Sequence, residues 1–387
     1  MKLPIYLDNH ATTPMDPQVF EAMRPYFLTK FGNASSKNHS FGWEANSAVE
    51  HARKQIAKII NAEPNEIIFT SGATESINLA LKGFAEAYCS KGKHIVSSVI
   101  EHSAVLDTLN YLSKVGFEIT YLSVDQNGLI SIPKLNESIR SDTILVSIMT
   151  ANNEIGSIQN VKAIGDICSA KNVLFHTDAS QAIGKIPFDV KENNIDLMSF
   201  TAHKLYGPKG IGALFIKKKR QPIKITPQIL GGGHENGYRS GTLNVPCIVG
   251  FGKAAEISNQ LLSNENERIA KLRNKLFQGI VSQLNGVNLN GSLTDRLGNN
   301  LNLSFDGIKS ESFILEMKDI AVSSGAACAS ATTKPSHVLT AISCTNEEAK
   351  NSIRFGIGRF NVEEEITYTI KRVVETVEKL RSISPAY

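Results

Sequence analysis

A single lysine, Lys204, stands between an apolar run and a turn rich in glycine and proline. The apolar run at 196–201 has β character, and a second one follows the turn at 213–216. Two short strands therefore place Lys204 at the mouth of a sheet. A lysine there can form a Schiff base with an aldehyde cofactor if burial and neighbouring cations lower its pKa. The ordinary alternative is a surface lysine in a turn.

Other polar side chains follow the ends of further predicted strands, where open parallel sheets bind their ligands. Asp178 could pair with a protonated pyridine nitrogen and make a bound ring a better electron sink. His102 could stack on that ring or act as acid or base, and Asn153 and Gln181 could donate to a ring oxygen. A helix cap at Asp178 and a structural histidine at 102 are the alternatives. Together with Lys204, the set matches what a pyridoxal phosphate site requires.

Two stretches could bind the phosphate of such a cofactor. Residues 71–74 read Ser-Gly-Ala-Thr between a strand and a helix, so free N–H groups, the helix dipole and two hydroxyls favour an anion there. A plain N-cap is the alternative. His203 could hold phosphate as well. In the glycine-rich residues 231–242, Thr242 could reach a phosphate, although a flexible surface turn would read the same way.

Cys328 lies in a run of small residues, 323–330, and differs in this from the other four cysteines. Because nothing bulky surrounds it in the sequence, we expect an accessible, reactive thiol in a mobile segment. A buried turn with an inert thiol is the alternative. Arg354 ends a predicted strand and could bind a substrate carboxylate with two hydrogen bonds, or could serve in a structural ion pair.

Strands and helices alternate in the first two thirds of the chain, which predicts an α/β fold with a mostly parallel sheet. A long helical stretch at 257–280 predicts a connector to a smaller α+β unit. We expect an irregular N-terminal segment over 1–20, a large domain over 21–256 and a small domain over 257–387. The predicted strands of the large domain, before that of Lys204, are 66–69, 95–99, 119–124, 143–149 and 173–176.

Composition is that of an ordinary soluble enzyme, with 42% hydrophobic and 20% charged residues in a chain of 387. The net charge is +4, and the one basic run, 217–220, lacks interleaved aromatics, so direct nucleic-acid binding is not expected. We expect a cytoplasmic protein without a membrane span or signal peptide. The five cysteines show no metal-ligand spacing, so neither a disulfide framework nor a metal site is expected.

Several motifs, spread over nearly the whole chain, resemble those of one family. The chain resembles the pyridoxal-phosphate-dependent cysteine desulfurases of the NifS/IscS type, in the aminotransferase class V group, and within it the IscS-like branch. The resemblance implies the fold type I of pyridoxal-phosphate-dependent transferases. The motifs that carry the resemblance are YLDNHATTP (6–14), TSGATES (70–76), NNEIG (152–156), HTDASQ (176–181), AHKLYGPKG (202–210), RSGT (239–242) and SGAAC (324–328).

The resemblance implies a role for each residue of the cofactor site. Lys204 carries the cofactor and shuttles a proton, and His102 stacks on the ring. Asp178 pairs with the pyridine nitrogen, Gln181 bonds the ring oxygen, and Asn153 contacts both cofactor and substrate. The residues implied to hold the phosphate are Ala73, Thr74, Thr201 and His203, joined by Thr242 from the partner subunit of a homodimer.

On the substrate side, the resemblance implies that Asn153 and Arg354 bind the carboxylate of L-cysteine, with Asn33. Cys328 then attacks the substrate sulfur, which leaves a persulfide on the enzyme and releases alanine. The segment after Cys328, residues 331–335, resembles the branch whose cysteine loop delivers sulfur to an acceptor protein. The implied pathways are iron–sulfur cluster assembly and tRNA thiolation.

Departures from the family pattern leave the chemistry intact. The C-terminal residues 382–387 are shorter than the tail with which IscS-like members often dock an iron–sulfur scaffold, so the docking of that partner stays open. Ala34 stands where proline is common, and Ile342-Ser343 replaces a usual Leu-Gly pair. Alternatives to a cysteine desulfurase are a selenocysteine lyase, another class V enzyme such as an aminotransferase, or a non-catalytic sulfur carrier.

Overall fold

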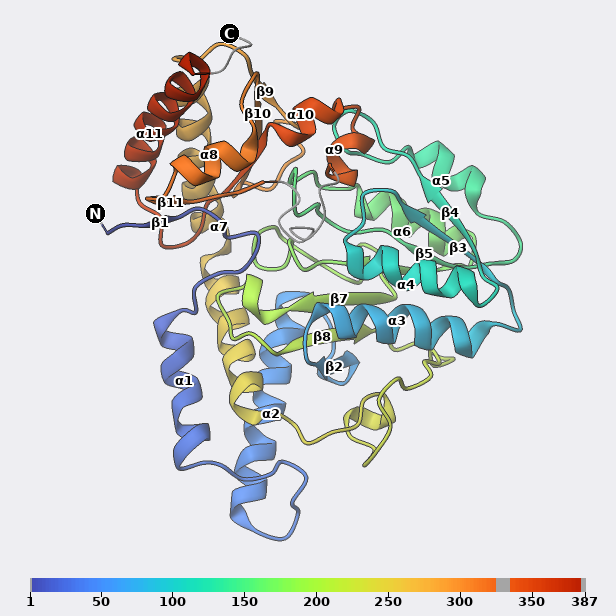
Figure 1. The fold of residues 1–387 in the computed structure, drawn as a ribbon. Coiled ribbons are helices and arrows are strands. Elements are labelled where there is room, and N and C mark those ends of the chain that lie inside the picture. Colours follow the sequence, from blue (N-terminus) through green and yellow to red (C-terminus); the bar gives the residue numbers. More distant parts are fainter. Residues whose placement is uncertain (1, 325–334, 384–387) are drawn as a thin grey trace.

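The computed structural model describes residues 2–324 and 335–383. Its largest element is a seven-stranded sheet with helices on both faces (Figure 1). Only β8 runs antiparallel to its neighbours, so the sheet is mostly parallel, as expected. In spatial order the strands are β2 (Ile67–Thr70), β8 (Gly212–Ile216), β7 (Leu197–Thr201), β6 (Leu174–Asp178), β5 (Thr143–Ser147), β3 (His94–Ser98) and β4 (Glu118–Leu122).

The central strands of this sheet are buried because helices cover both faces, whereas the edge strand β4 is partly exposed. Successive residues enter different cores: Ile68 packs in one cluster and Phe69 in the other, and the same holds for Leu197 and Met198. One core takes helices α3 (Ala73–Tyr88) and α4 (Ser103–Lys114). The opposite core takes α1 (Pro17–Leu28), α2 (Ser40–Ile59), α5 (Ile132–Ser138), α6 (Val161–Ala170) and the first half of α7 (Val245–Val281).

A smaller α+β unit has its own core and its own antiparallel sheet. Its first strand, β1 (Ile5–Tyr6), pairs in parallel with β11 (Ile320–Ala321), so the N-terminus packs against the C-terminal third of the chain. The four-stranded sheet is β12 (Ser323–Ser324), β13 (Ser352–Gly356), β10 (Asn300–Phe305) and β9 (Val287–Leu289). The helices of this unit are α8 (Ser310–Glu316), α9 (His337–Ala341), α10 (Asn346–Lys350) and α11 (Glu363–Ser382).

Helix α7 joins the two units as one 37-residue helix (Figure 1). The expected start at 257 was wrong, because Pro246 reads as a break in the sequence but is tolerated in the first turn of a helix. Asn244 caps that turn by accepting from the backbone N–H of Cys247 at 3.3 Å. The division at 256/257 therefore falls inside a continuous helix, and we keep it as a proposal.

The N-terminal segment is also more regular than expected. Helix α1 begins at Pro17, where Asp16 accepts from the backbone N–H of Gln18 at 2.9 Å. No helix among residues 2–324 and 335–383 is long and apolar enough to cross a membrane.

Candidate active site

Lys204 lies at the carboxyl edge of the large sheet, in the short 3-10 turn η2 (Ala202–Lys204) that follows β7. The turn is held from both sides, since the backbone N–H of Ala202 donates to the carbonyl of Ile211 at 3.2 Å. After the lysine, Tyr206 adopts a left-handed backbone with φ of 61°. The chain then returns through β8, so Lys204 is fixed between two paired strands.

A cavity of about 490 Å³ surrounds Lys204, and we call it the Lys204 cavity. Its walls come from the N-terminal segment, the ends of β6 and β7, the start of α4 and the first turn of α3. Of the predicted cofactor residues it brings together Ala73, Thr74, His102, Asp178, Thr201, His203 and Lys204. The other lining residues are Ala11, Thr12, Ser71, Gly72, Glu75, Ile77, Ser180, Lys209 and Gly210.

The first turn of α3 offers its backbone N–H groups to this cavity. Gly72 is the N-cap, and the next residues, Ala73 and Thr74, have no carbonyl of their own helix to donate to. The one acid of this turn, Glu75, is neutralised because Arg239 donates to it at 2.8 Å. An anion at the helix start therefore meets hydrogen-bond donors and a paired carboxylate rather than a free negative charge.

His102 is both a helix cap and part of the cavity wall. Its Nδ1 accepts from the backbone N–H of Ala104 at 3.1 Å, which places the ring proton on Nε2 in the neutral form. Burial lowers the pKa of His102, and Lys204 adds to this while Asp178 opposes it. Asp178 ends β6 and accepts from the backbone N–H of Ser180 at 2.9 Å. The expected alternative for Asp178, a helix cap, is replaced by this local turn.

His203 faces several cations of the site. Burial, followed by Lys204 and Lys209, lowers the pKa of His203 to about 4. The neutral ring lies with Nδ1 3.1 Å from the hydroxyl of Thr12, so its two nitrogens are free to divide donor and acceptor roles between protein and ligand. This corner of the cavity combines imidazole, ammonium and hydroxyl groups, which suits a phosphate.

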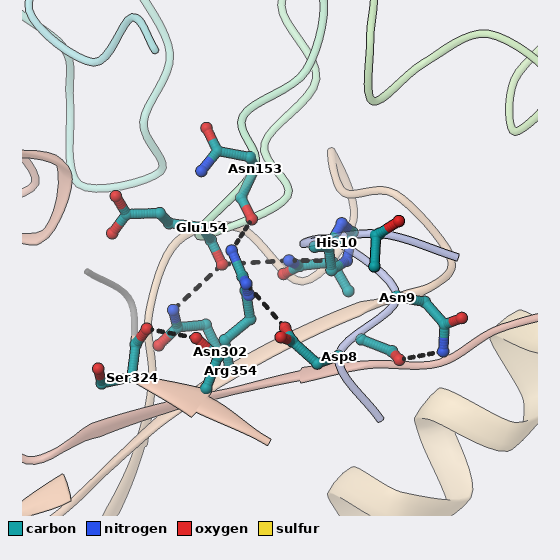
Figure 2. Close-up of polar contacts among 12 residues, drawn as sticks. Asp8, Asn9, His10, Asn153, Glu154, Asn302, Ser324 and Arg354 are labelled. Atoms are coloured by element: carbon teal, nitrogen blue, oxygen red, sulfur yellow. Dashed lines mark hydrogen bonds and ion pairs between the residues drawn. The ribbon is translucent and has the colours of Figure 1, made fainter. Parts of the chain in front are cut away.

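Arg354 lies outside the cavity lining, at the junction of the two units (Figure 2). In the antiparallel sheet, Arg354 of β13 pairs with Asn302 on β10 and with Ser323 on β12, the last strand before residues 325–334 in the sequence. Its guanidinium donates to the carbonyl of Asn153 at 2.9 Å and to Asp8 at 2.8 Å. Figure 2 shows the Asn153 side chain turned away from the guanidinium, so these predicted carboxylate ligands meet through the backbone of Asn153.

Gln181 also lies beside the cavity rather than in its lining. Its amide nitrogen donates to the carbonyl of His10 at 3.0 Å, and its amide oxygen lies 3.0 Å from Nδ1 of His10. Lys185 donates to the same oxygen at 3.1 Å. Sequence reasoning assigned no role to His10 or Lys185. The only sequence feature that could have indicated the Gln181–Lys185 contact is their spacing of four residues.

Two predicted residues lie on exposed segments of the chain. Asn33 is in the connection between α1 and α2, where it accepts from the backbone N–H of Ser35 at 2.9 Å. Thr242 is exposed just before α7. Neither lines the Lys204 cavity of this chain. Cys328 lies outside the described residues.

Two buried carboxyls near the site were also missed. Burial raises the pKa of Glu101 to about 8 and that of Glu154 to about 7. Glu101 accepts from the backbone N–H of Met149 at 2.9 Å, and Glu154 accepts from the hydroxyl of Ser336 at 2.5 Å. No group of acidic, histidine or cysteine side chains suited to a metal occurs among the described residues.

Comparison with known proteins supports the motif-based interpretation. The family model described as aminotransferase class-V matches residues 5–368. Cysteine desulfurase IscS of Anaeromyxobacter sp. (strain Fw109-5) is 52% identical over 387 residues, covering 100% of this chain and 96% of that protein. A solved NifS-like protein superimposes with a TM-score of 0.90 at 40% identity, covering 97% of this chain and 100% of the other.

A second solved structure, described as SspA in complex with cysteine, superimposes with a TM-score of 0.82 at 37% identity. It covers 92% of this chain and 100% of the other. These structures share the fold of this chain, so the expected α/β architecture is confirmed.

Proposed function

Because this chain belongs to the aminotransferase class V family and is a cysteine desulfurase, we propose that it converts L-cysteine to L-alanine in the Lys204 cavity with pyridoxal 5'-phosphate. The observation that carries the proposal is the meeting of Lys204, Asp178 and His102 with the start of α3 in one cavity. The relative described in complex with cysteine supports the choice of substrate.

The residues present fit this cofactor. The Ser180 hydroxyl lines the cavity, is buried, and has no hydrogen-bond partner in the described chain, so it has capacity for a ligand. The donors at the phosphate end would be the first turn of α3, Thr201 and His203. Asp178 would face the pyridine nitrogen and His102 the ring. Bound pyridoxal phosphate supplies an electron sink that makes the substrate α-carbon acidic and its sulfur open to nucleophilic attack.

The protein side of the mechanism follows from position. Lys204 would take the proton from the substrate α-carbon and return it, because it lines the cavity together with Asp178 and His102. Arg354 would hold the substrate carboxylate with the guanidinium hydrogens that Asn153 and Asp8 leave unused. The Cys328 thiolate would attack the substrate sulfur, so the carbon–sulfur bond breaks, a sulfur–sulfur bond forms, and protonation of the carbon product gives alanine.

We also propose a homodimer in which Thr242, and Asn33 with it, serve the cavity of the partner. Both residues are exposed, and neither lines the cavity of its own chain. Large apolar side chains are exposed around the α1–α2 connection, which favours a second copy as the occupant of this face. They are Phe20, Phe27, Leu28, Phe31, Phe41 and Trp43.

Cytoplasmic sulfur supply is the proposed role in the cell. The IscS relatives and the position of Cys328 after β12 support delivery of persulfide sulfur to an acceptor protein for iron–sulfur clusters or tRNA thiolation. A selenocysteine lyase is the alternative. Comparing turnover of L-cysteine and L-selenocysteine in the Cys328→Ala variant separates them, because a lyase would keep its selenocysteine activity.

A single turnover with L-cysteine tests the proposal. Mass spectrometry of the Cys328 peptide should show one added sulfur, and the amount of alanine should match it. Lys204→Ala should abolish both products, and Lys224→Ala, on an exposed segment away from the cavity, should leave them unchanged. Alanine without a persulfide would refute the role of Cys328, and a protein that binds the cofactor but forms neither product would refute the substrate.

A further inference from the structure

Lys185 lies in the turn that follows β6, outside the lining of the Lys204 cavity. Its Nζ lies 3.1 Å from the amide oxygen of Gln181. Among residues 2–324 and 335–383, Lys185 forms no ion pair with an acidic side chain, and the charged groups that act on it are the cations Lys204 and Arg354. A partly buried lysine without a carboxylate partner is unusual, since its charge is stabilised by little besides this one hydrogen bond.

The orientation of the Gln181 amide is determined by the groups around it. The carbonyl of His10 can only accept, so the amide atom 3.0 Å from it must be the nitrogen. A lysine ammonium can only donate, so the amide atom next to Lys185 must be the oxygen. The two contacts agree on one orientation: the reversed amide would lose the bond to the His10 carbonyl in every case, and the bond from Lys185 whenever Lys185 is an ammonium.

The tautomer of His10 follows from that orientation. Burial, followed by Lys185 and Arg354, holds the pKa of His10 well below its usual range, so the ring is neutral. Its Nδ1 lies 3.0 Å from the Gln181 oxygen, which can only accept, so Nδ1 carries the proton. Nε2 then accepts from the amide nitrogen of Asn300 at 3.2 Å, and the carbonyl of Asn299, also 3.2 Å away, receives no hydrogen bond from this tautomer. The Gln181 oxygen thus receives two hydrogen bonds, one from His10 and one from Lys185.

Lys185 can donate its hydrogen bond to Gln181 in either protonation state. Burial, followed by Lys204 and Arg354, lowers the pKa of Lys185 to about 7. Both the ammonium and the neutral amine carry N–H groups, so the hydrogen bond to Gln181 survives in either form. With its oxygen occupied and one amide hydrogen on the His10 carbonyl, Gln181 keeps one hydrogen for a further acceptor.

We propose that Lys185 is a positioning residue that, with His10, fixes the Gln181 amide so that its remaining N–H is presented to the ring oxygen of the cofactor. The inference rests on the proposed function, because Gln181 is the residue proposed to bond that oxygen. Lys185 itself does not line the Lys204 cavity and acts through Gln181.

The test is a double-mutant cycle read by cofactor binding rather than by turnover. Apoprotein is titrated with pyridoxal phosphate, and the dissociation constant and the visible absorption maximum are measured for wild type, Lys185→Met, Gln181→Ala and the double variant. Lys185→Met should weaken binding about threefold to tenfold and shift the maximum, since one hydrogen bond of about 1 kcal/mol is lost. In the Gln181→Ala background the same change should have an effect below about twofold.

Lys185→Arg keeps a donor and should restore most of the affinity, and Lys224→Met, on the exposed surface, should behave as wild type. An unchanged Lys185→Met, or an equal effect of Lys185→Met with and without Gln181, would overturn the inference. If Lys185→Met does not fold, the comparison of Lys185→Arg with Lys185→Gln carries the test. A wild type that binds no cofactor would instead refute the proposed function.

Discussion

Arg359 covers the ring of Tyr206, with its guanidinium carbon 4.2 Å from the ring centroid, and its backbone N–H donates to the Tyr206 hydroxyl at 2.6 Å. Tyr206 lies two residues after Lys204 in a left-handed conformation that costs free energy for a residue other than glycine. The same guanidinium is bound by Asp16 at 3.0 Å and by Glu265 of α7 at 2.7 Å. The turn of Lys204 is thus tied to α7 and to the N-terminal segment.

Replacing Arg359 with methionine should therefore destabilise the protein strongly. The variant leaves two buried carboxylates without a cation, and breaking a buried pair in this way costs about 3–5 kcal/mol. Tyr206→Phe removes only the hydroxyl acceptor and should cost about 1 kcal/mol. Urea unfolding of both variants measures the difference, and equal costs for the two would show that the ion pairs contribute nothing.

Thr242 lies in the glycine-rich loop 231–242. Glu235 should attach this loop to the large domain. Its two carboxylate oxygens each accept from Arg53 at 2.8 Å, and one also accepts from the backbone N–H of Phe69 at 2.7 Å. Glu235→Gln removes the buried anion of Arg53 and leaves it only the half-exposed carboxylate of Glu50 at 3.1 Å, which we expect to cost about 2–3 kcal/mol in unfolding experiments. Glu364→Gln, on the exposed first turn of α11, is the matched control and should cost less than about 0.5 kcal/mol.

His102 should show separable capping and chemical roles. Asparagine at this position can still accept from the backbone N–H of Ala104, whereas alanine cannot, and loss of the cap costs about 1 kcal/mol. Both His102→Asn and His102→Ala remove the ring and should lower kcat by about 100-fold or more. An active His102→Asn enzyme would mean that the histidine only caps α4.

The sequence was sufficient to predict those elements whose boundaries are local. Helices α4 and α6 are of this kind, since their apolar periodicity and their caps lie within a few residues of sequence. Asp178, His102 and Lys204 could be proposed as neighbours because each follows a strand of one sheet. The start of α7 was missed because its apolar positions read as a helix only when Pro246 is accepted in the first turn.

The rest of the site depends on contacts between distant parts of the chain. Arg354 meets Asp8, 346 residues away, and Gln181 meets His10, 171 residues away. No periodicity or spacing encodes such pairs. Lys185 gained a role only because its nitrogen lies beside an amide oxygen whose own orientation another contact determines. The burial of Glu101 could not be predicted either. The sequence shows an acid next to His102, but not that it contacts Ser98 of β3 and Met149 after β5.

Glu101 should make stability fall as pH rises. Burial raises its pKa to about 8 in the folded protein, while an unfolded glutamate titrates near about 4.3. Between these values the folded state binds more protons than the unfolded state, so the contribution of this group is fully present below about pH 4.3 and is lost as pH rises through about 8. One oxygen of the carboxyl shares the backbone N–H of Met149 at 3.1 Å, and the other oxygen accepts from the same N–H at 2.9 Å and from the hydroxyl of Ser98 at 2.7 Å.

Glu101→Gln keeps that oxygen and replaces the other with a group that cannot ionise. We expect wild type to lose up to about 1.4 kcal/mol per pH unit relative to this variant between pH 6 and 8, because histidines and other groups are common to both and cancel. Urea unfolding of the two proteins at pH 6, 7, 8 and 9, both with cofactor bound, measures the difference. Parallel stability curves would show that Glu101 is ionised in the folded protein at pH 6, with Ser98 and Met149 stabilising the charge against burial.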